Sequence, residues 1–248
     1  MPTQSEPRAW EHVLNHLEQM LVSGELSPGQ RLPGERVLAA ELGVGRSSVR
    51  EALRVMEAMG LLKSQTGSGP TSGAMIVSRP TGGMTMLMRM QVAAQNFPVT
   101  DVVQTRLVLE SEVMRSLATR TPTPDLGSAE ELLDAMDDTA LEPHEFLVLD
   151  SQFHIALADA AGNHVIAAMM AGLRESIEGY VLAGAPLAIW PATCGRLRHE
   201  HRGLVAAVRA GDPDLACARI EGHIRGYYSE TLGSTSPHPT PPGSTTHV

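Results

Sequence analysis

The sequence predicts a mainly α-helical chain of two domains and a tail, and three observations support this fold class. Apolar residues recur at helical spacing over most of the chain. The densest turn signals before residue 120 lie at 67–73 (GSGPTSG) and 80–83 (PTGG), which favours a domain boundary near residues 79–83. Residues 1–79 carry eight basic and eight acidic side chains, so the net charge of −9 falls entirely on residues 80–248.

The composition excludes several classes of protein. With 42% hydrophobic and 19% charged residues, the chain of 248 residues can bury a core, which argues against general disorder. No apolar run approaches the roughly 20 residues of a membrane helix, and the first residues do not resemble a secretion signal, so we expect a cytoplasmic protein without membrane contact. Cys194 and Cys217 form no Cys-x-x-Cys pair, so neither a disulfide framework nor a thiolate zinc site is expected.

The first 79 residues predict three helices followed by a β-hairpin. Apolar spacing indicates one helix over 10–21, which Gly24 ends. A second helix begins after Leu32-Pro33-Gly34, with Val37, Leu38 and Leu42 facing inward, and a third runs over 49–59. Two short helices joined by a glycine-containing turn are typical of a helix-turn-helix. Segments 61–64 and 74–77 predict the two strands of a wing, so residues 1–79 form a winged helix-turn-helix domain.

The third helix carries candidate DNA contacts. A helix in the major groove presents its N-terminal turn to the base edges. That turn holds polar and basic side chains that can bind guanine, other bases or phosphates: Arg46, Ser47, Ser48 and Arg50. Arg36, on the second helix, is expected near the same groove edge. On charge alone, the alternative that these arginines form a solvated helix face with Glu51 and Glu57 stays open.

The segment PGQRLPGERVLAAELGVGRSSVREALRVMEAMGLL resembles the winged helix-turn-helix signature of the GntR family of bacterial transcription regulators. The resemblance implies DNA contacts by Arg36, Arg46, Ser48 and Arg50, with Gly67 at the wing tip near the minor groove. Gly34 and Gly45 stand where the family usually has Ser, Thr or a similar residue at a helix start. Glycine is a tolerated N-cap, so the fold is expected to be kept.

The remainder divides into a linker or first connecting helix over 80–98, an all-α bundle over 99–232 and a disordered tail over 233–248. The clearest helical periods cover 102–117, 146–161, 165–181, 196–208 and 215–232. Asp150 and His154 are four residues apart and share an apolar helix face with Phe153, so both are expected to point into the bundle. A carboxylate on that face is costly unless it is paired, hydrogen-bonded or metal-bound.

Two further histidines flank a predicted helical hairpin. His201 lies ten residues before Gly211 and His223 ten residues after Pro213. At about 1.5 Å of rise per residue, antiparallel helices bring both histidines level. Three imidazoles and one carboxylate inside a bundle are typical of a divalent transition-metal site, with zinc as the first choice and nickel or manganese as alternatives. Taken singly, each histidine is more typical of a hydrogen-bonded core residue, whereas the matched register favours a metal.

These residues also resemble the FCD effector domain of the FadR branch of the GntR family. The motifs are Asp150-x3-His154, Gly162-Asn163, Glu200-His201-Arg202, Gly211-Asp212 and His223, with RLVLE from Arg106 to Glu110 upstream. The resemblance implies a bundle of six or seven helices and a divalent metal held by Asp150, His154, His201 and His223. A small organic acid would complete the coordination, and Arg106 would pair with its carboxylate. The alternative for Arg106 is a surface salt bridge with Glu110.

Together these features predict a ligand-responsive bacterial transcription regulator, most often a repressor in this family, and not an enzyme. One winged helix reads only a half-site, so we expect a homodimer on a palindromic double-stranded operator, located at the nucleoid when bound. The alternative is a metal-dependent enzyme that uses the His3Asp site, but it leaves the first domain unexplained. A third possibility is an architectural DNA-binding protein in which these four residues are merely structural.

Overall fold

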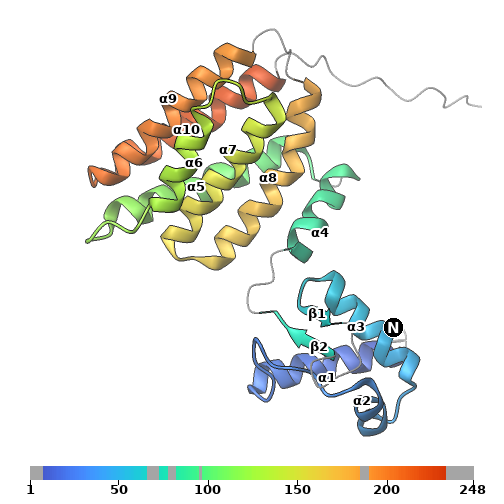
Figure 1. The fold of residues 1–248 in the computed structure, drawn as a ribbon. Helices are drawn as coiled ribbons and strands as arrows, with labels where there is room; N and C mark the ends of the chain where they lie inside the picture. Colours follow the sequence, from blue (N-terminus) through green and yellow to red (C-terminus); the bar gives the residue numbers. More distant parts are fainter. Residues whose placement is uncertain (1–7, 66–72, 78–81, 95–96, 185–189, 233–248) are drawn as a thin grey trace, which may run out of the picture. The chain divides into compact units, whose positions relative to one another are not determined.

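A computed structural model describes residues 8–65, 73–77, 82–94, 97–184 and 190–232. Within these residues the chain forms ten helices and two short strands, which confirms the predicted fold class (Figure 1). The chain divides into two compact units between Leu87 and Met88, inside the segment 80–98 that the sequence assigns to a linker or connecting helix. Gly67 and the predicted tail over 233–248 lie outside the described residues.

The N-terminal unit is a small helical domain with a two-stranded hairpin. Its elements are α1 (Ala9–Ser23), α2 (Glu35–Leu42), α3 (Arg46–Ala58), β1 (Leu62–Gln65) and β2 (Gly73–Ile76). Helices α1 and α2 end at Gly24 and Gly43, which have positive φ values of 80° and 64°. Glycine adopts this left-handed conformation at a lower energetic cost than other residues. Gly34 and Gly45 occupy the N-cap positions of α2 and α3 with extended backbone and without a side-chain cap, as the sequence predicts.

The wing carries one feature that the sequence does not predict. Strands β1 and β2 pair in antiparallel fashion, with Leu62 opposite Ile76. The segment before α2 joins them, because Arg31 forms a bridge with Met75 and the Leu32 N–H donates to the carbonyl of Ala74 at 2.9 Å. A single bridge leaves no alternating apolar pattern in the sequence by which it could be found.

The prediction that Val37 faces the core is wrong. Its side chain is 45% exposed, whereas Leu38 beside it is fully buried. Helix α2 has eight residues, and Leu38, Ala39 and Leu42 form its packed stripe. Successive residues are rotated by about 100° around a helix, so the side chain before Leu38 points toward solvent.

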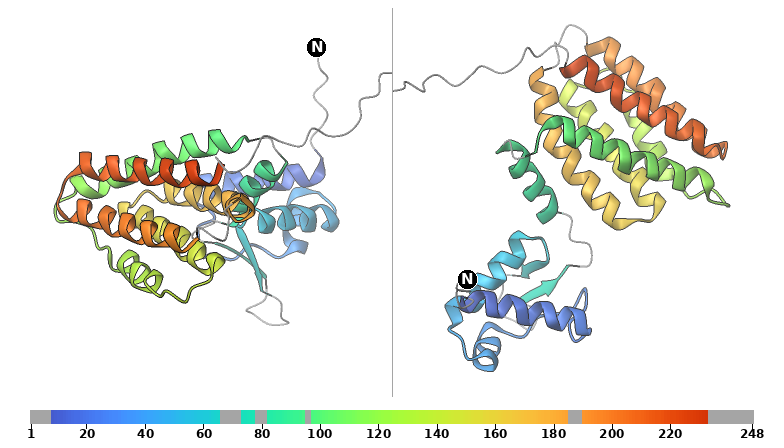
Figure 2. Two further views of the ribbon diagram at one scale, coloured as in Figure 1. Left: turned by 90° about the horizontal axis from the view of Figure 1, so that it is seen from above. Right: turned by 180° about the vertical axis from the view of Figure 1, so that it is seen from behind.

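The C-terminal unit is an all-α bundle, and α4 crosses the division between the two units. Its elements are α4 (Gly82–Ala93), α5 (Val99–Thr119), α6 (Gly127–Met136), α7 (Pro143–Ala161), α8 (His164–Gly184), α9 (Trp190–Arg209) and α10 (Pro213–Leu232). Helix α10 lies along α5 and forms an antiparallel hairpin with α9, while α7 packs against α6 and α8 (Figures 1 and 2). The core lies between these helices around Phe146, Phe153 and Leu204. No helix in the described part of the chain is long and apolar enough to cross a membrane.

Candidate metal centre and DNA-binding helix

Two turns fix the helices that carry the candidate metal ligands. Gly162 ends α7 with φ 81°, and the Asn163 carboxamide caps α8 by accepting two backbone N–H bonds at 3.1 and 3.2 Å. Gly211, with φ 67°, and Asp212, whose carboxylate accepts a first-turn N–H of α10 at 2.9 Å, act similarly between α9 and α10. These contacts give a physical role to the Gly162-Asn163 and Gly211-Asp212 pairs of the sequence.

The four predicted ligands converge inside the bundle. Asp150 and His154 come from α7, His201 from α9 and His223 from α10, and all four are buried. One nitrogen or oxygen ligand atom from each residue lies within 4.8 Å of those of the others. The ring centroid of His154 is 5.2 Å from that of His201 and 5.1 Å from that of His223. The ring centroids of His201 and His223 are 4.8 Å apart. The structure thus brings these four side chains together, while their role as metal ligands stays a prediction.

Two carboxylates orient two of these histidines. Glu110 Oε2 lies 2.8 Å from Nδ1 of His154, and Glu200 Oε2 lies 2.8 Å from Nδ1 of His223. An ionised carboxylate only accepts hydrogen bonds, so Nδ1 carries the proton in both rings. The Nε2 atom of each neutral ring then keeps a lone pair, which is the form of histidine that binds a metal.

The hydrogen bonding of the buried ring nitrogens indicates whether a metal ion fits the cluster. Among the described residues, Nε2 of His154 and both ring nitrogens of His201 have no hydrogen-bond partner. Asp150 Oδ1 lies 3.0 Å from Nε2 of His201, but outside hydrogen-bonding geometry. Each unpaired buried polar atom costs about 1–3 kcal/mol. Three imidazoles and one carboxylate at these distances fit a divalent transition metal, which would satisfy the unpaired atoms.

Two buried arginines, Arg106 and Arg174, pair with the carboxylates of the cluster. Arg106 donates through Nε to Glu110 Oε1 at 2.7 Å and through Nη1 to the Tyr228 hydroxyl at 2.7 Å. Arg106 is only 5% exposed. The alternative prediction of a salt bridge with Glu110 is therefore right about the pair but wrong in placing it at the surface. Arg174 donates to Asp150 Oδ2 at 2.8 Å and to Glu110 Oε2 at 2.9 Å.

Sequence reasoning missed Arg174 and the orienting roles of Glu110 and Glu200. Both glutamates belong to motifs quoted from the sequence, but the histidine partner of each lies on another helix. Arg174 lies within the predicted helical segment 165–181, on the buried side of α8. A charged residue at a buried helical position is the signal that could have found it, because such a charge requires a partner.

Neighbouring positive charges keep the two buried carboxyls ionised. Burial alone would raise the pKa of Glu110, but Arg106 and Arg174 outweigh it and hold that pKa well below its usual value. Burial likewise opposes ionisation of Asp150, and its neighbours His201 and Arg174 lower its pKa well below the usual range. Both groups therefore carry a negative charge at pH 7.

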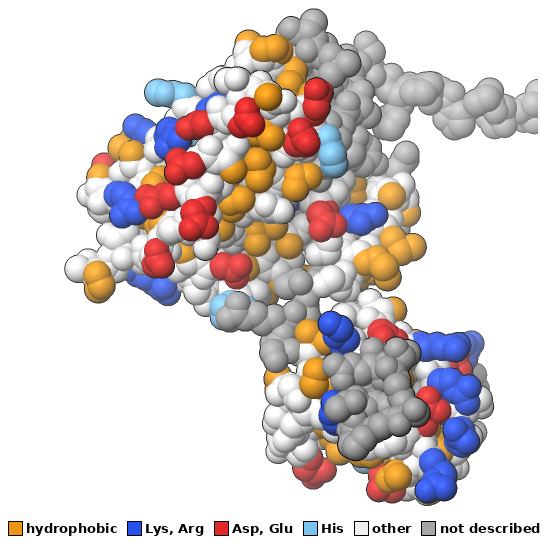
Figure 3. All heavy atoms as spheres, in the orientation of Figure 1, with side chains coloured by type: hydrophobic (Ala, Val, Ile, Leu, Met, Phe, Trp, Pro, Cys, Tyr) orange, Lys and Arg blue, Asp and Glu red, His pale blue; other side chains and the backbone are white. Residues whose placement is uncertain are grey.

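The first turn of α3 holds the candidate DNA contacts. Arg46 and Arg50 project from it with side chains that are 63% and 52% exposed, and Arg36 on α2 and Ser47 are also exposed, whereas Ser48 is half-buried. Glu35 Oε2 lies 3.9 Å from Arg46 Nη2 and 3.5 Å from Arg50 Nε, a pairing that the sequence reasoning did not foresee. Figure 3 shows Lys and Arg side chains gathered along one edge of the N-terminal unit, and acidic side chains spread over the visible face of the bundle.

Comparisons with known proteins decide the family. Residues 10–71 match the family described as bacterial regulatory proteins, gntR family, and residues 101–226 match the FCD domain. The chain belongs to the GntR family. It is 30% identical over 231 residues to the HTH-type transcriptional repressor NanR of Salmonella schwarzengrund, which covers 86% of this chain and 81% of that protein. The NanR of Salmonella newport matches at the same identity, over 82% of its length.

A solved structure supports the same assignment. The Streptococcus agalactiae GntR matches this GntR-family chain with a TM-score of 0.64 and 26% sequence identity, over 87% of this chain and 97% of that one. A GntR helix-turn-helix joined to an FCD domain makes this protein a transcription regulator that binds DNA.

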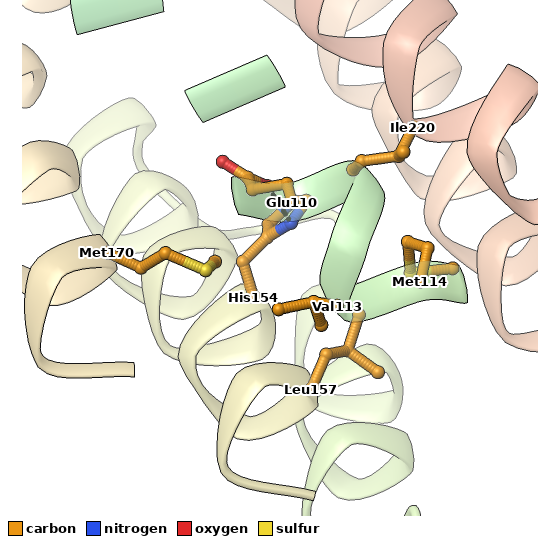
Figure 4. Close-up of a pocket in the computed structure, with 7 residues that line it drawn as sticks. All are labelled: Glu110, Val113, Met114, His154, Leu157, Met170 and Ile220. Atoms are coloured by element: carbon orange, nitrogen blue, oxygen red, sulfur yellow. Dashed lines mark ion pairs between the residues drawn. The ribbon is translucent and has the colours of Figure 1, made fainter. Parts of the chain in front are cut away.

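A narrow void lies beside the metal-ligand cluster of this GntR regulator (Figure 4). It is lined by Glu110, Val113 and Met114 of α5, His154 and Leu157 of α7, Met170 of α8 and Ile220 of α10. The space between these side chains is too narrow for a water molecule. A molecule that binds on this side of His154 must therefore displace packed side chains.

Acidification is expected to destabilise the metal-free regulator. Burial, and then Arg174, lower the pKa of His154 well below its usual value, and burial also lowers the pKa of His223, although Glu200 opposes that shift. Below about pH 6.5 the unfolded chain therefore binds more protons than the folded one, so stability falls as the pH drops toward the folded pKa values. Urea unfolding in the presence of a chelator, at about pH 7.5 and 5.5, measures the change.

The contribution of one ring can be separated in that experiment. The variant His223→Asn is expected to lose less stability than the wild type between the two pH values, because it removes one of the two rings whose pKa is lowered by burial. His164→Asn, which changes an exposed histidine, serves as the control. Equal urea midpoints for the wild type at both pH values would contradict the assignment of neutral rings.

Proposed function

We propose that this regulator is a repressor that binds a palindromic operator as a homodimer and responds to a small organic acid at a divalent metal ion. Asp150, His154, His201 and His223 would hold the ion, with zinc as the first choice and nickel or manganese as alternatives. The buried Nε2 of His154 and Nδ1 of His201, which have no hydrogen-bond partner among the described residues, carry the proposal, because folded proteins rarely leave such atoms unpaired without a functional reason. The repressor names of its relatives support the direction of regulation.

The arrangement of the site supports an acid as the effector. When bound, a divalent ion supplies a Lewis-acidic centre that prefers an anionic oxygen as a further ligand. Arg106 is proposed to bind the carboxylate of that acid. Its hydrogen bond to the neutral Tyr228 hydroxyl is the contact to be replaced, since a bond between two charged groups is roughly twice as strong.

The acid would act on DNA binding through a difference in affinity between two states of the dimer. A dimer whose two recognition helices match the half-site spacing binds the operator, and an acid that prefers another geometry weakens that binding. A preference of roughly 1–3 kcal/mol changes operator affinity about 5- to 150-fold.

Metal analysis combined with thermal unfolding tests the proposal. Protein purified without added metal is expected to contain roughly one divalent transition ion per chain. A panel of small carboxylic acids is expected to raise the Tm of the metal-loaded protein by about 5 °C at concentrations near 100 Kd, and to leave the chelated protein unchanged. A protein without metal whose Tm does not respond to zinc would contradict the metal site. Full metal occupancy without a response to any acid would contradict the effector.

A further inference from the structure

One carboxylate in the N-terminal unit pairs with both arginines at the start of α3. Glu35 is the first residue of α2, and its Oε2 atom lies 3.5 Å from Arg50 Nε and 3.9 Å from Arg46 Nη2. Arg46 and Arg50 are four residues apart on α3, so their side chains lie on the same face of that helix. Like charges at this spacing repel each other, and the Glu35 carboxylate offsets the repulsion.

This pairing is selective among the arginines of the two helices. Helices α2 and α3 carry four exposed arginines, which are Arg36, Arg46, Arg50 and Arg54. In the part of the chain that the structure describes, Arg36 and Arg54 have no ionic or hydrogen-bond partner. Glu35 therefore restrains the two arginines at the start of α3 and leaves the other two free to move.

A carboxylate beside a guanidinium decides which of its nitrogens stay available. The guanidinium is planar, and its five N–H donors keep a fixed arrangement. Because Arg50 turns Nε toward Glu35, its Nη1 and Nη2 remain for another acceptor. Two N–H donors side by side match the O6 and N7 acceptors of guanine. A phosphate competes for the same nitrogens, but the Glu35 carboxylate repels a phosphate and does not repel the neutral edge of a base.

The two ion pairs contribute little to the stability of the free domain. The side chains of Glu35, Arg46 and Arg50 are 34%, 63% and 52% exposed, so water and salt screen their attraction. In a DNA groove the same atoms lose much of that water, and their attraction grows as the local dielectric constant falls. The carboxylate therefore acts on the DNA-bound state, in which it favours base contacts over phosphate contacts.

We propose that Glu35 is a specificity-determining residue of this regulator, which positions Arg46 and Arg50 toward guanines and keeps them from binding phosphates. The inference rests on the predicted DNA contacts of these two arginines and is independent of the metal site. Glu35 is a positioning residue, because it acts through the arginines. Arg36 and Arg54, which lack such a carboxylate, are suited to phosphate contacts at any sequence.

Paired DNA-binding measurements on the full chain test the inference. Fluorescence anisotropy compares an operator selected from random duplexes with a scrambled duplex of the same composition, over a range of salt concentrations. Glu35→Gln keeps the size of the side chain and removes its charge. It is expected to bind the scrambled duplex more tightly and to lower the ratio of operator affinity to scrambled affinity by at least about 5-fold, the lower end for one bidentate base contact. The salt dependence of log K for the scrambled duplex is expected to steepen by roughly 1 for each arginine released onto a phosphate.

Glu41→Gln is the matched control for this variant. Glu41 is an exposed glutamate of the same helix without an ionic partner among the described residues, so its replacement changes the net charge equally. It is expected to leave the ratio of the two affinities near the wild-type value. Glu35→Gln is expected to unfold at nearly the wild-type temperature, since exposed ion pairs contribute little to folding.

A further set of variants separates positioning from direct contact. In a protein that carries Arg46→Ala and Arg50→Ala, adding Glu35→Gln is expected to leave the affinity ratio unchanged, because neither arginine is left to position. A loss of specificity that persists in that protein would overturn the inference, since Glu35 would then contact a base itself. An unchanged ratio in Glu35→Gln, or an equal fall in Glu41→Gln, would also overturn it. Full operator affinity without Arg46 and Arg50 would instead show that the predicted DNA contacts are wrong.

Discussion

Replacing Arg46 with Ala is expected to weaken operator binding by the dimer by roughly 2–6 kcal/mol. Arg46 is the first residue of α3 and its side chain is 63% exposed, so it is placed to reach a base edge from the first turn of the recognition helix. One arginine bound to guanine through two hydrogen bonds contributes about 1–3 kcal/mol of discrimination, and a dimer loses two such contacts. Fluorescence anisotropy with an operator selected from random duplexes measures the loss.

Arg54→Ala is the matched control for this variant. Arg54 is an exposed arginine of the same helix, two turns beyond Arg46, so it is expected to contribute at most a phosphate contact that lowers affinity equally for all sequences. Glu35→Gln removes the negative charge that faces Arg46 and Arg50, and it is expected to increase binding to unrelated DNA. Wild-type operator affinity in the Arg46→Ala protein would contradict the assignment of α3 as the reading helix.

Replacing His223 with Ala is expected to remove most of the bound metal. The change deletes one of four proposed ligands and leaves Glu200 without the ring that it orients. Loss of an orienting partner alone costs about 10- to 100-fold in metal affinity, and loss of a ligand is expected to exceed that. Zinc competition with a chromophoric chelator measures the change, and operator affinity without acid is expected to stay near the wild-type value.

Two variants show whether the loss is specific to the metal centre. His199→Ala changes an exposed histidine of α9 and is expected to retain metal fully. Glu200→Gln keeps His223 but replaces the orienting carboxylate, so it is expected to fall between His223→Ala and the wild type. An acid response that persists in His223→Ala would refute the effector site.

The sequence could predict which histidines meet, but not the charges that surround them. His201 and His223 come together because they lie ten residues before and ten residues after the turn that joins α9 to α10, and the rise per helical residue is fixed. The partners of Arg174 are 24 and 64 residues away on two other helices, so pairing depends on how α5, α7 and α8 pack. Periodicity places a residue on a face of its own helix and says nothing about the facing helix.

Short helices were the second feature that apolar spacing predicted poorly. Helix α6 was not among the predicted helical periods, because it has ten residues and its buried positions are only Ala129, Leu133 and Met136, between acidic neighbours. Val37 failed for a related reason: in an eight-residue helix, three neighbouring apolar positions fit more than one face. Longer segments such as α7 and α10 average over many turns, and their spacing identified them.

The tight packing beside His154 affects the rate at which a metal ion can reach the cluster. All four candidate ligands are buried, and the void next to them does not admit a water-sized sphere. An ion that approaches from this side can reach the cluster only when the packed side chains move apart, so its entry from this side depends on how often the bundle opens locally, a slow process compared with diffusion. Loading of the proposed ion through this side would then be limited by the opening of the bundle rather than by the concentration of free ions at the moment of regulation.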